Sequence, residues 1–105
     1  MSTVVLTAAA ALLMAANPAP GLDRGARIAQ QRCAACHAVG SAGRSPNLAA
    51  PTFRNIRMRY NALSLERELA KISTKGHFEM RPQTIGSGEA EDLAAYIETL
   101  GPAPH

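Results

Sequence analysis

The two cysteines of this 105-residue chain stand three positions apart, and a histidine follows the second one directly, in the string Cys33-Ala34-Ala35-Cys36-His37. At the end of a helix this spacing puts both thiols on one side of the chain, where both can add to the vinyl groups of a single porphyrin. The neighbouring imidazole then lies where it can bind the iron. The string therefore predicts a covalently attached haem held by Cys33, Cys36 and His37.

Two other kinds of site use a cysteine pair. A thioredoxin-like dithiol or disulfide expects a strand before the helix, and no strand pattern precedes Cys33. A zinc site needs a fourth ligand, and His77 is the well-placed candidate besides the two thiols and His37. Haem attachment is favoured over both because the chain has no Trp and only four other aromatic residues, so a large apolar cofactor would supply the missing core volume.

An uncharged leader precedes the haem motif. Residues 1–22 contain no acidic or basic side chain, and the apolar stretch 4–16 is followed by a segment with two prolines. A stretch of this length matches the core of a signal peptide and is too short to span a bilayer. We expect residues 1–20 to be a cleaved signal peptide, in which the small residues Ala15 and Ala16 offer a cleavage point, and residues 21–105 to form one exported, periplasmic domain. The alternatives are an uncleaved membrane anchor and a disordered alanine-rich leader.

The remaining sequence has the pattern of an all-α domain. Apolar side chains recur at the helical period, and no segment alternates as a half-buried strand does. The pattern predicts a helix from Asp23 to about Cys36, a short helix from Phe53 to Tyr60, a helix capped by Ser64 and ended by Gly76, and a last helix from Ser87 to Leu100. Segments 38–51 and 76–86 carry the Gly, Pro, Ser and Asn residues expected of loops.

A haem iron needs a second axial ligand or has an open coordination position. Met80 lies in the irregular segment 76–86, where the chain can cross to the haem face opposite His37. Met58 falls on the expected short helix and is more often a core or surface residue. His77 is the chief rival of Met80 and would make the site bis-histidine. Met80 is the favoured ligand.

With these residues the chain resembles a bacterial class I cytochrome c over essentially its whole mature length. The resemblance rests on Gly25, Ala29 and Cys33 ahead of the motif, on Gly76-His77-Phe78-Glu79-Met80, and on Leu93-Ala94-Ala95-Tyr96-Ile97. It implies the class I cytochrome c fold, with about four helices around one haem. In that fold the first and last helices cross closely, with a small residue of one against an aromatic residue of the other, and here Gly25 would meet Tyr96.

The resemblance also implies the surroundings of the iron. His37 and Met80 are the implied axial ligands, and a proline carbonyl is the implied hydrogen-bond partner of the second histidine nitrogen. Pro51 is preferred to Pro46 for that position. One difference from the family is that Arg81 stands between Met80 and the next proline.

A haem with both axial positions filled predicts an electron carrier rather than an enzyme. It would be a soluble monomer or the cytochrome subunit of a periplasmic oxidoreductase. If Met80 does not bind iron, the alternative is a five-coordinate haem protein that binds a small ligand or turns over peroxide. A metal-free thiol redox protein is a third possibility.

The charge suggests the kind of partner. Eleven basic and eight acidic side chains give a net charge of +3. Arg44, Arg54, Arg57 and Arg59 are expected around the haem, where they would steer an acidic redox partner. An equally weighted alternative is that these arginines keep a solvated face soluble or pair with the haem propionates. Nucleic-acid binding is not expected, and membrane contact would need an uncleaved leader.

Overall fold

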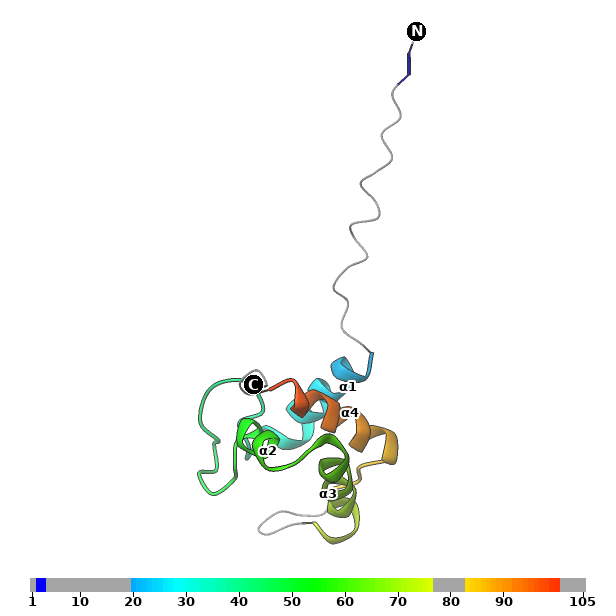
Figure 1. Cartoon of the computed structure of the whole chain (residues 1–105). Helices are drawn as coiled ribbons and strands as arrows, with labels where there is room; N and C mark the ends of the chain where they lie inside the picture. The colour runs from blue at the N-terminus through cyan, green and yellow to red at the C-terminus, as the bar shows by residue number, and fades with distance from the viewer. Residues whose placement is uncertain (1, 4–19, 77–82, 101–105) are drawn as a thin grey trace.

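The computed structural model describes residues 2–3, 20–76 and 83–100. In chain order its helices are α1 (Pro20–Ile28), the π-helical turn η2 (Ala29–Cys33), α2 (Phe53–Arg59), α3 (Ala62–Lys75) and α4 (Ser87–Glu98). Helix α4 packs against α1, α3 and α2, while the loop between η2 and α2 extends on the α2 side (Figure 1). The described ranges contain no strand, so the predicted all-α class is confirmed. None of their helices is long and apolar enough to cross a membrane.

The first helix starts earlier than predicted. It begins at Pro20 rather than at Asp23, since proline suits the first helical position, where no backbone donor is needed. Asp23 then lies in the first turn, where its charge favours the helix, and it pairs with Arg27. Helix α1 continues into η2, whose wider turn ends at Cys33.

The junction between α2 and α3 also differs from the prediction. Helix α2 ends at Arg59, and α3 is capped by Asn61 instead of Ser64. The Asn61 side chain accepts from the Ser64 backbone N–H (2.8 Å), and the Ser64 hydroxyl accepts from the Asn61 backbone N–H (3.1 Å). Ser64 is thus the third helical residue of a capping box. The predicted stop at Gly76 is confirmed, with a positive φ of 63°.

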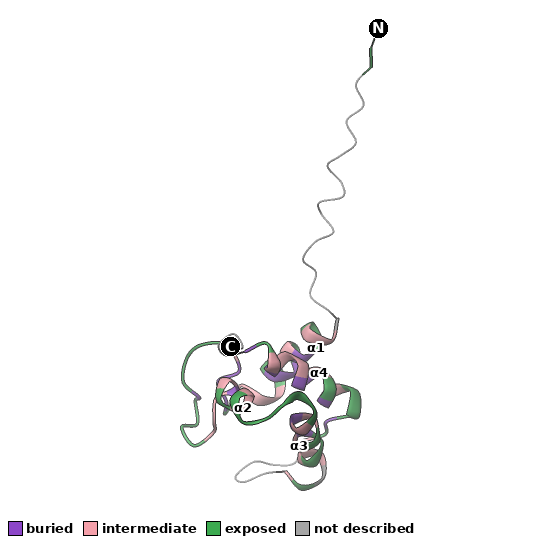
Figure 2. Cartoon of the chain, viewed as in Figure 1, coloured by how far each residue is buried: buried purple, intermediate pink, exposed green. Residues whose placement is uncertain are grey.

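The core lies where α1, α3 and α4 meet (Figure 2). Leu65 and Leu69 of α3 are buried in it, as are Leu93, Ile97 and Leu100 in and just after α4. Ile72 and Tyr96 pack against this core while remaining partly exposed.

Helices α1 and α4 cross so closely that a side chain does not fit at Gly25. A Cβ atom there would overlap the carbonyl oxygen of Asp92 and would lie 2.8 Å from Cβ of Tyr96. The predicted contact between Gly25 and Tyr96 is confirmed, and the Asp92 backbone is closer still. Arg24 pairs with the Asp92 side chain at the same crossing.

Candidate functional site

A cavity of about 350 Å³ lies between the cysteine motif and helices α2 and α3. Phe53 and Ile56 form one wall, and Leu65, Leu69 and Ile72 form another. Ligand sites in proteins are mostly apolar cavities of this order with a few polar groups. The apolar walls of the cavity therefore suit a large apolar group such as a porphyrin. The polar side chains that line the cavity must also suit the chemistry of that group.

His37 supplies the most specific polar group of the cavity. Its side chain is buried, with 7% exposed, and Nδ1 lies 2.7 Å from the carbonyl oxygen of Pro51. Because a carbonyl only accepts, Nδ1 carries the proton, and Nε2 holds the lone pair in the neutral ring. The Phe53 ring packs against the imidazole at 5.4 Å between centroids. The ring is therefore fixed as a ligating histidine requires.

The loop that carries Pro51 is tied to the rest of the fold on both sides. The Phe53 backbone N–H donates to the Ala38 carbonyl (2.9 Å), which brings the end of the loop back to its start. The Tyr96 hydroxyl donates to the Val39 carbonyl (2.7 Å). Helix α4 thereby holds the chain just after His37, so the close crossing of α1 and α4 helps to position the histidine.

The two cysteines differ in environment. Cys33 lines the cavity and is partly buried, whereas Cys36 is exposed, and no disulfide joins them. Burial raises the pKa of the Cys33 thiol to about 11, although the neighbouring Arg32 partly opposes the shift. Redox-active thiols have a lowered pKa, because the thiolate is the reactive form. This environment does not favour Cys33 as the reactive thiol of a metal-free redox protein.

The described residues contain no group of three or more His, Cys, Asp or Glu side chains that could hold a metal ion. His77, the fourth ligand considered for zinc, lies outside the described residues, as does Met80. Met58, the other methionine considered for the iron, is 62% exposed on α2.

The four arginines predicted around the haem are placed differently from one another. Arg59 lines the cavity. Arg54 donates to the Gly43 carbonyl (3.0 Å) and Arg57 to the Glu98 carbonyl (3.4 Å), so both hold backbone segments together. Arg44 is exposed on the loop.

Sequence reasoning missed three charged residues of the cavity, all on α3. Glu68, Lys71 and Lys75 line the cavity beside Leu65, Leu69 and Ile72 of the same helix. Lys71 pairs with Glu68 at 2.9 Å. Their spacing of three and four residues is helical and could have shown that they share one side of the helix.

A family model described as cytochrome c matches residues 22–101. The chain belongs to the cytochrome c family. Membership agrees with the all-helical fold and with the Cys33 and Cys36 pair, and it identifies covalent haem c as the cofactor and haem-based electron transfer as the chemistry. No curated protein and no solved structure matches the chain.

Within this cytochrome c fold, the residues present fit the cofactor. The cavity offers apolar walls, one cysteine of the attachment pair and a histidine whose ring is already oriented. Cys33 and Cys36 would hold the porphyrin covalently, and His37 would approach the iron through Nε2.

Proposed function

We propose that this cytochrome is a mono-haem electron carrier, or the cytochrome subunit of a periplasmic oxidoreductase, with His37 and Met80 as axial ligands. The bound haem supplies the one-electron ferric/ferrous couple. The observation that carries the proposal is the hydrogen bond of His37 Nδ1 to Pro51, because it fixes both tautomer and ring orientation. Two filled axial positions exclude substrate from the iron, which is why we propose a carrier and not an enzyme.

Methionine as the second ligand gives the main test of this function. A thioether favours ferrous iron and raises the reduction potential relative to a second imidazole. We expect the reduced wild-type protein to bind carbon monoxide slowly and Met80→Ala to bind it rapidly, with a lower reduction potential. Stopped-flow spectroscopy and potentiometry measure both effects.

Met58→Ala is the matched control for this test, since Met58 is exposed on α2. We expect Met58→Ala to match the wild type both in its rate of carbon monoxide binding and in its reduction potential. Rapid carbon monoxide uptake by the wild-type protein would instead favour a five-coordinate haem protein that binds a small ligand or peroxide.

The proposal includes export to the periplasm, where residues 1–20 would be removed as a signal peptide. The support is the uncharged apolar stretch ahead of a c-type haem motif. Amino-terminal sequencing of the haem protein from a periplasmic fraction tests it: a chain still starting at Met1 contradicts cleavage.

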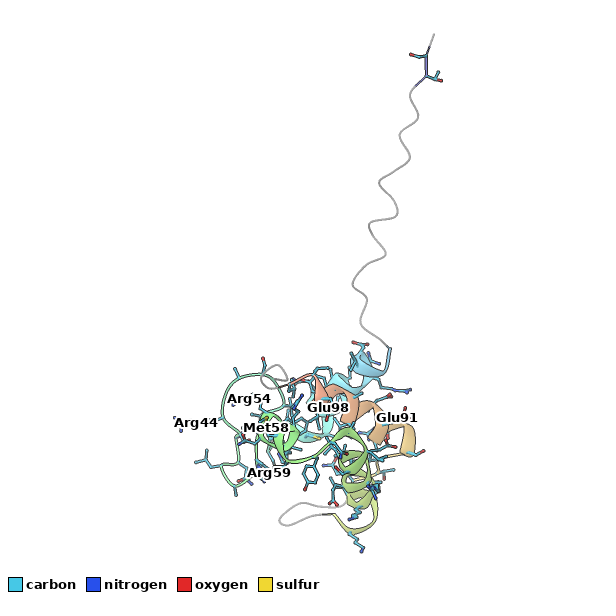
Figure 3. The ribbon with its side chains drawn as sticks, in the orientation of Figure 1. Arg44, Arg54, Met58, Arg59, Glu91 and Glu98 are labelled. Carbon is cyan, nitrogen blue, oxygen red and sulfur yellow. The ribbon has the colours of Figure 1, made fainter. Side chains whose placement is uncertain are left out.

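An uneven distribution of charge supports an acidic redox partner. The sequence between Asp23 and Glu66 has seven arginines and no acidic residue, whereas α4 is acidic and has no basic residue. Arg44, Arg54 and Arg59 lie on the side of the molecule formed by α2 and the preceding loop, away from Glu91 on α4 (Figure 3). We call this side the basic face. Such a separation of charge orients an approaching partner.

Charge reversal on the basic face should slow oxidation by an anion. With ferricyanide as the oxidant, we expect Arg44→Glu and Arg59→Glu each to lower the second-order rate about threefold at low ionic strength, and less at high salt. Stopped-flow measurements at a series of salt concentrations give the second-order oxidation rate of each variant at low and at high ionic strength. Arg67→Glu on α3 makes the same change of net charge, and an equal effect from it would mean that the face has no special role.

A further inference from the structure

Ser45 and His37 are the two buried polar side chains among the residues that the structure describes, with 6% and 7% exposed. The two are connected through the backbone of Ala38, which directly follows His37. The Ser45 hydroxyl oxygen accepts a hydrogen bond from the Ala38 backbone N–H at 3.0 Å. Serine is mostly an exposed residue, and a buried hydroxyl needs a hydrogen-bond partner. The contact with Ala38 accounts for the burial of Ser45.

The backbone on the other side of His37 is held by the same loop. The Asn47 backbone N–H donates to the carbonyl of Cys36, which directly precedes His37, at 3.1 Å. Ser45 and Asn47 stand two positions apart in the sequence. One short stretch of the loop therefore binds the residue before the histidine and the residue after it.

Asn47 also begins the turn that carries the chain from this stretch to Pro51. Its side-chain oxygen accepts from the Ala49 backbone N–H and its carbonyl accepts from the Ala50 backbone N–H, each at 2.9 Å. An asparagine side chain that bonds the backbone two residues ahead stabilises such a turn. The Pro51 carbonyl then accepts the His37 Nδ1 proton at 2.7 Å. The loop thus holds the histidine at three points, two on its flanking backbone and one on its ring.

We propose that Ser45 and Asn47 are positioning residues for the axial histidine, because they set where the Pro51 carbonyl meets its ring. This inference rests on the proposed ligation of iron by His37. A carbonyl that accepts from the second ring nitrogen orients the imidazole and makes it a stronger donor to iron, which favours the ferric state. Moving the carbonyl away should weaken this hydrogen bond and shift the ferric/ferrous equilibrium towards ferrous iron.

The two residues differ in how much their removal releases. Ser45→Ala leaves the buried Ala38 N–H without its acceptor, and such a group costs free energy until it finds another partner or water. The loop should therefore separate from the chain after His37. Asn47→Ala is a smaller change, because the backbone bond to Cys36 remains and only the turn towards Pro51 loosens.

Ser64 supplies the matched control. Its hydroxyl also accepts from a backbone N–H, that of Asn61 at 3.1 Å, but it does so at the start of α3 and outside the loop. Ser64→Ala thus removes the same kind of hydrogen bond without touching the loop. Ser45→Thr and Asn47→Asp are the conservative variants, since each keeps an oxygen that can accept the same hydrogen bond.

Hydrogen exchange of the His37 Nδ1 proton, followed by NMR in the reduced, diamagnetic holoprotein, is the direct measurement. We expect this exchange to be about tenfold faster in Ser45→Ala and about threefold faster in Asn47→Ala than in the wild type. Both conservative variants and Ser64→Ala should exchange at the wild-type rate. If the iron is five-coordinate, the ferrous carbon monoxide complex serves instead, since it is also diamagnetic.

The reduction potential is the second readout. Ser45→Ala should shift the ferric/ferrous equilibrium about threefold towards ferrous iron, which for a one-electron couple is an increase of about 28 mV. Ser45→Thr should restore the wild-type potential. A role in folding alone would lower the stability of Ser45→Ala and Ser64→Ala alike and would change neither the exchange rate nor the potential selectively.

The possible failures are distinguishable. The ring protons of a ligating His37 are shifted upfield by the ring current of the porphyrin, so unshifted signals in the wild type overturn the ligation and the positioning role together. Upfield signals with equal exchange in Ser45→Ala and Ser64→Ala leave the ligation standing and show that the positioning role is wrong. If Ser45→Ala does not mature, Asn47→Ala compared with Asn47→Asp decides the question.

Discussion

Replacing both Cys33 and Cys36 with serine is expected to abolish covalent haem attachment completely. Both thioether bonds are lost, while His37 and the apolar cavity walls remain. Haem that still enters the cavity would then be held by coordination and apolar contact alone. Mass spectrometry of the purified chain should give the bare polypeptide mass, and acid acetone should extract any colour.

The single variant Cys36→Ser is the control for this experiment. Cys33 lines the cavity, so it can still form one thioether, whereas the exposed Cys36 contributes the second. We expect the single variant to keep haem through acid acetone, with a pyridine haemochrome spectrum shifted towards that of a haem with one vinyl group. A double variant that retains its colour after extraction would contradict attachment through these two thiols.

Local signals in the sequence predicted the starts of α2 and α4 and the end of α3, whereas α4 ends at Glu98 and not at Leu100. The last helix starts at Ser87 as predicted, and Gly76 ends α3 because its positive φ suits glycine. The start of α3 was misjudged because Asn61 and Ser64 are both good capping residues and stand three apart. Either could serve as the cap, and together they form one capping box.

Local signals could not predict distant contacts, and those of Gly25 with Tyr96 and of His37 with Pro51 were expected only from the resemblance to class I cytochromes c. The pairing of Arg32 with Glu89 spans 57 positions in the sequence and depends on how η2 lies against α4. The hydrogen bond of His37 to Pro51 spans 14 positions, and the sequence offered Pro46 as an alternative in the same loop. The Cys33 to His37 motif was visible from the sequence because its chemistry needs near neighbours, whereas its supporting contacts arise from tertiary packing.

Gly25→Ala is expected to destabilise the folded protein by about 2 kcal/mol, as overpacking at a tight contact does. The new methyl group would overlap the Asp92 carbonyl oxygen and lie 2.8 Å from Tyr96 Cβ. Alanine gains up to about 1 kcal/mol of helix propensity over glycine, but that gain is smaller than the cost of moving two packed backbones apart. Urea unfolding of the holoprotein, followed by circular dichroism, measures the difference.

The same substitution at Gly88 separates packing from helix propensity. Gly88 lies in α4, and a Cβ atom there would meet nothing within 4 Å. We expect Gly88→Ala to be neutral or to stabilise the protein by up to about 1 kcal/mol. Because moving α4 away from α1 would also strain the bond from Tyr96 to Val39, Gly25→Ala should in addition weaken the hold on the chain after His37. Equal stability of the two variants would show that α1 and α4 can separate without cost, which the close approach at Asp92 argues against.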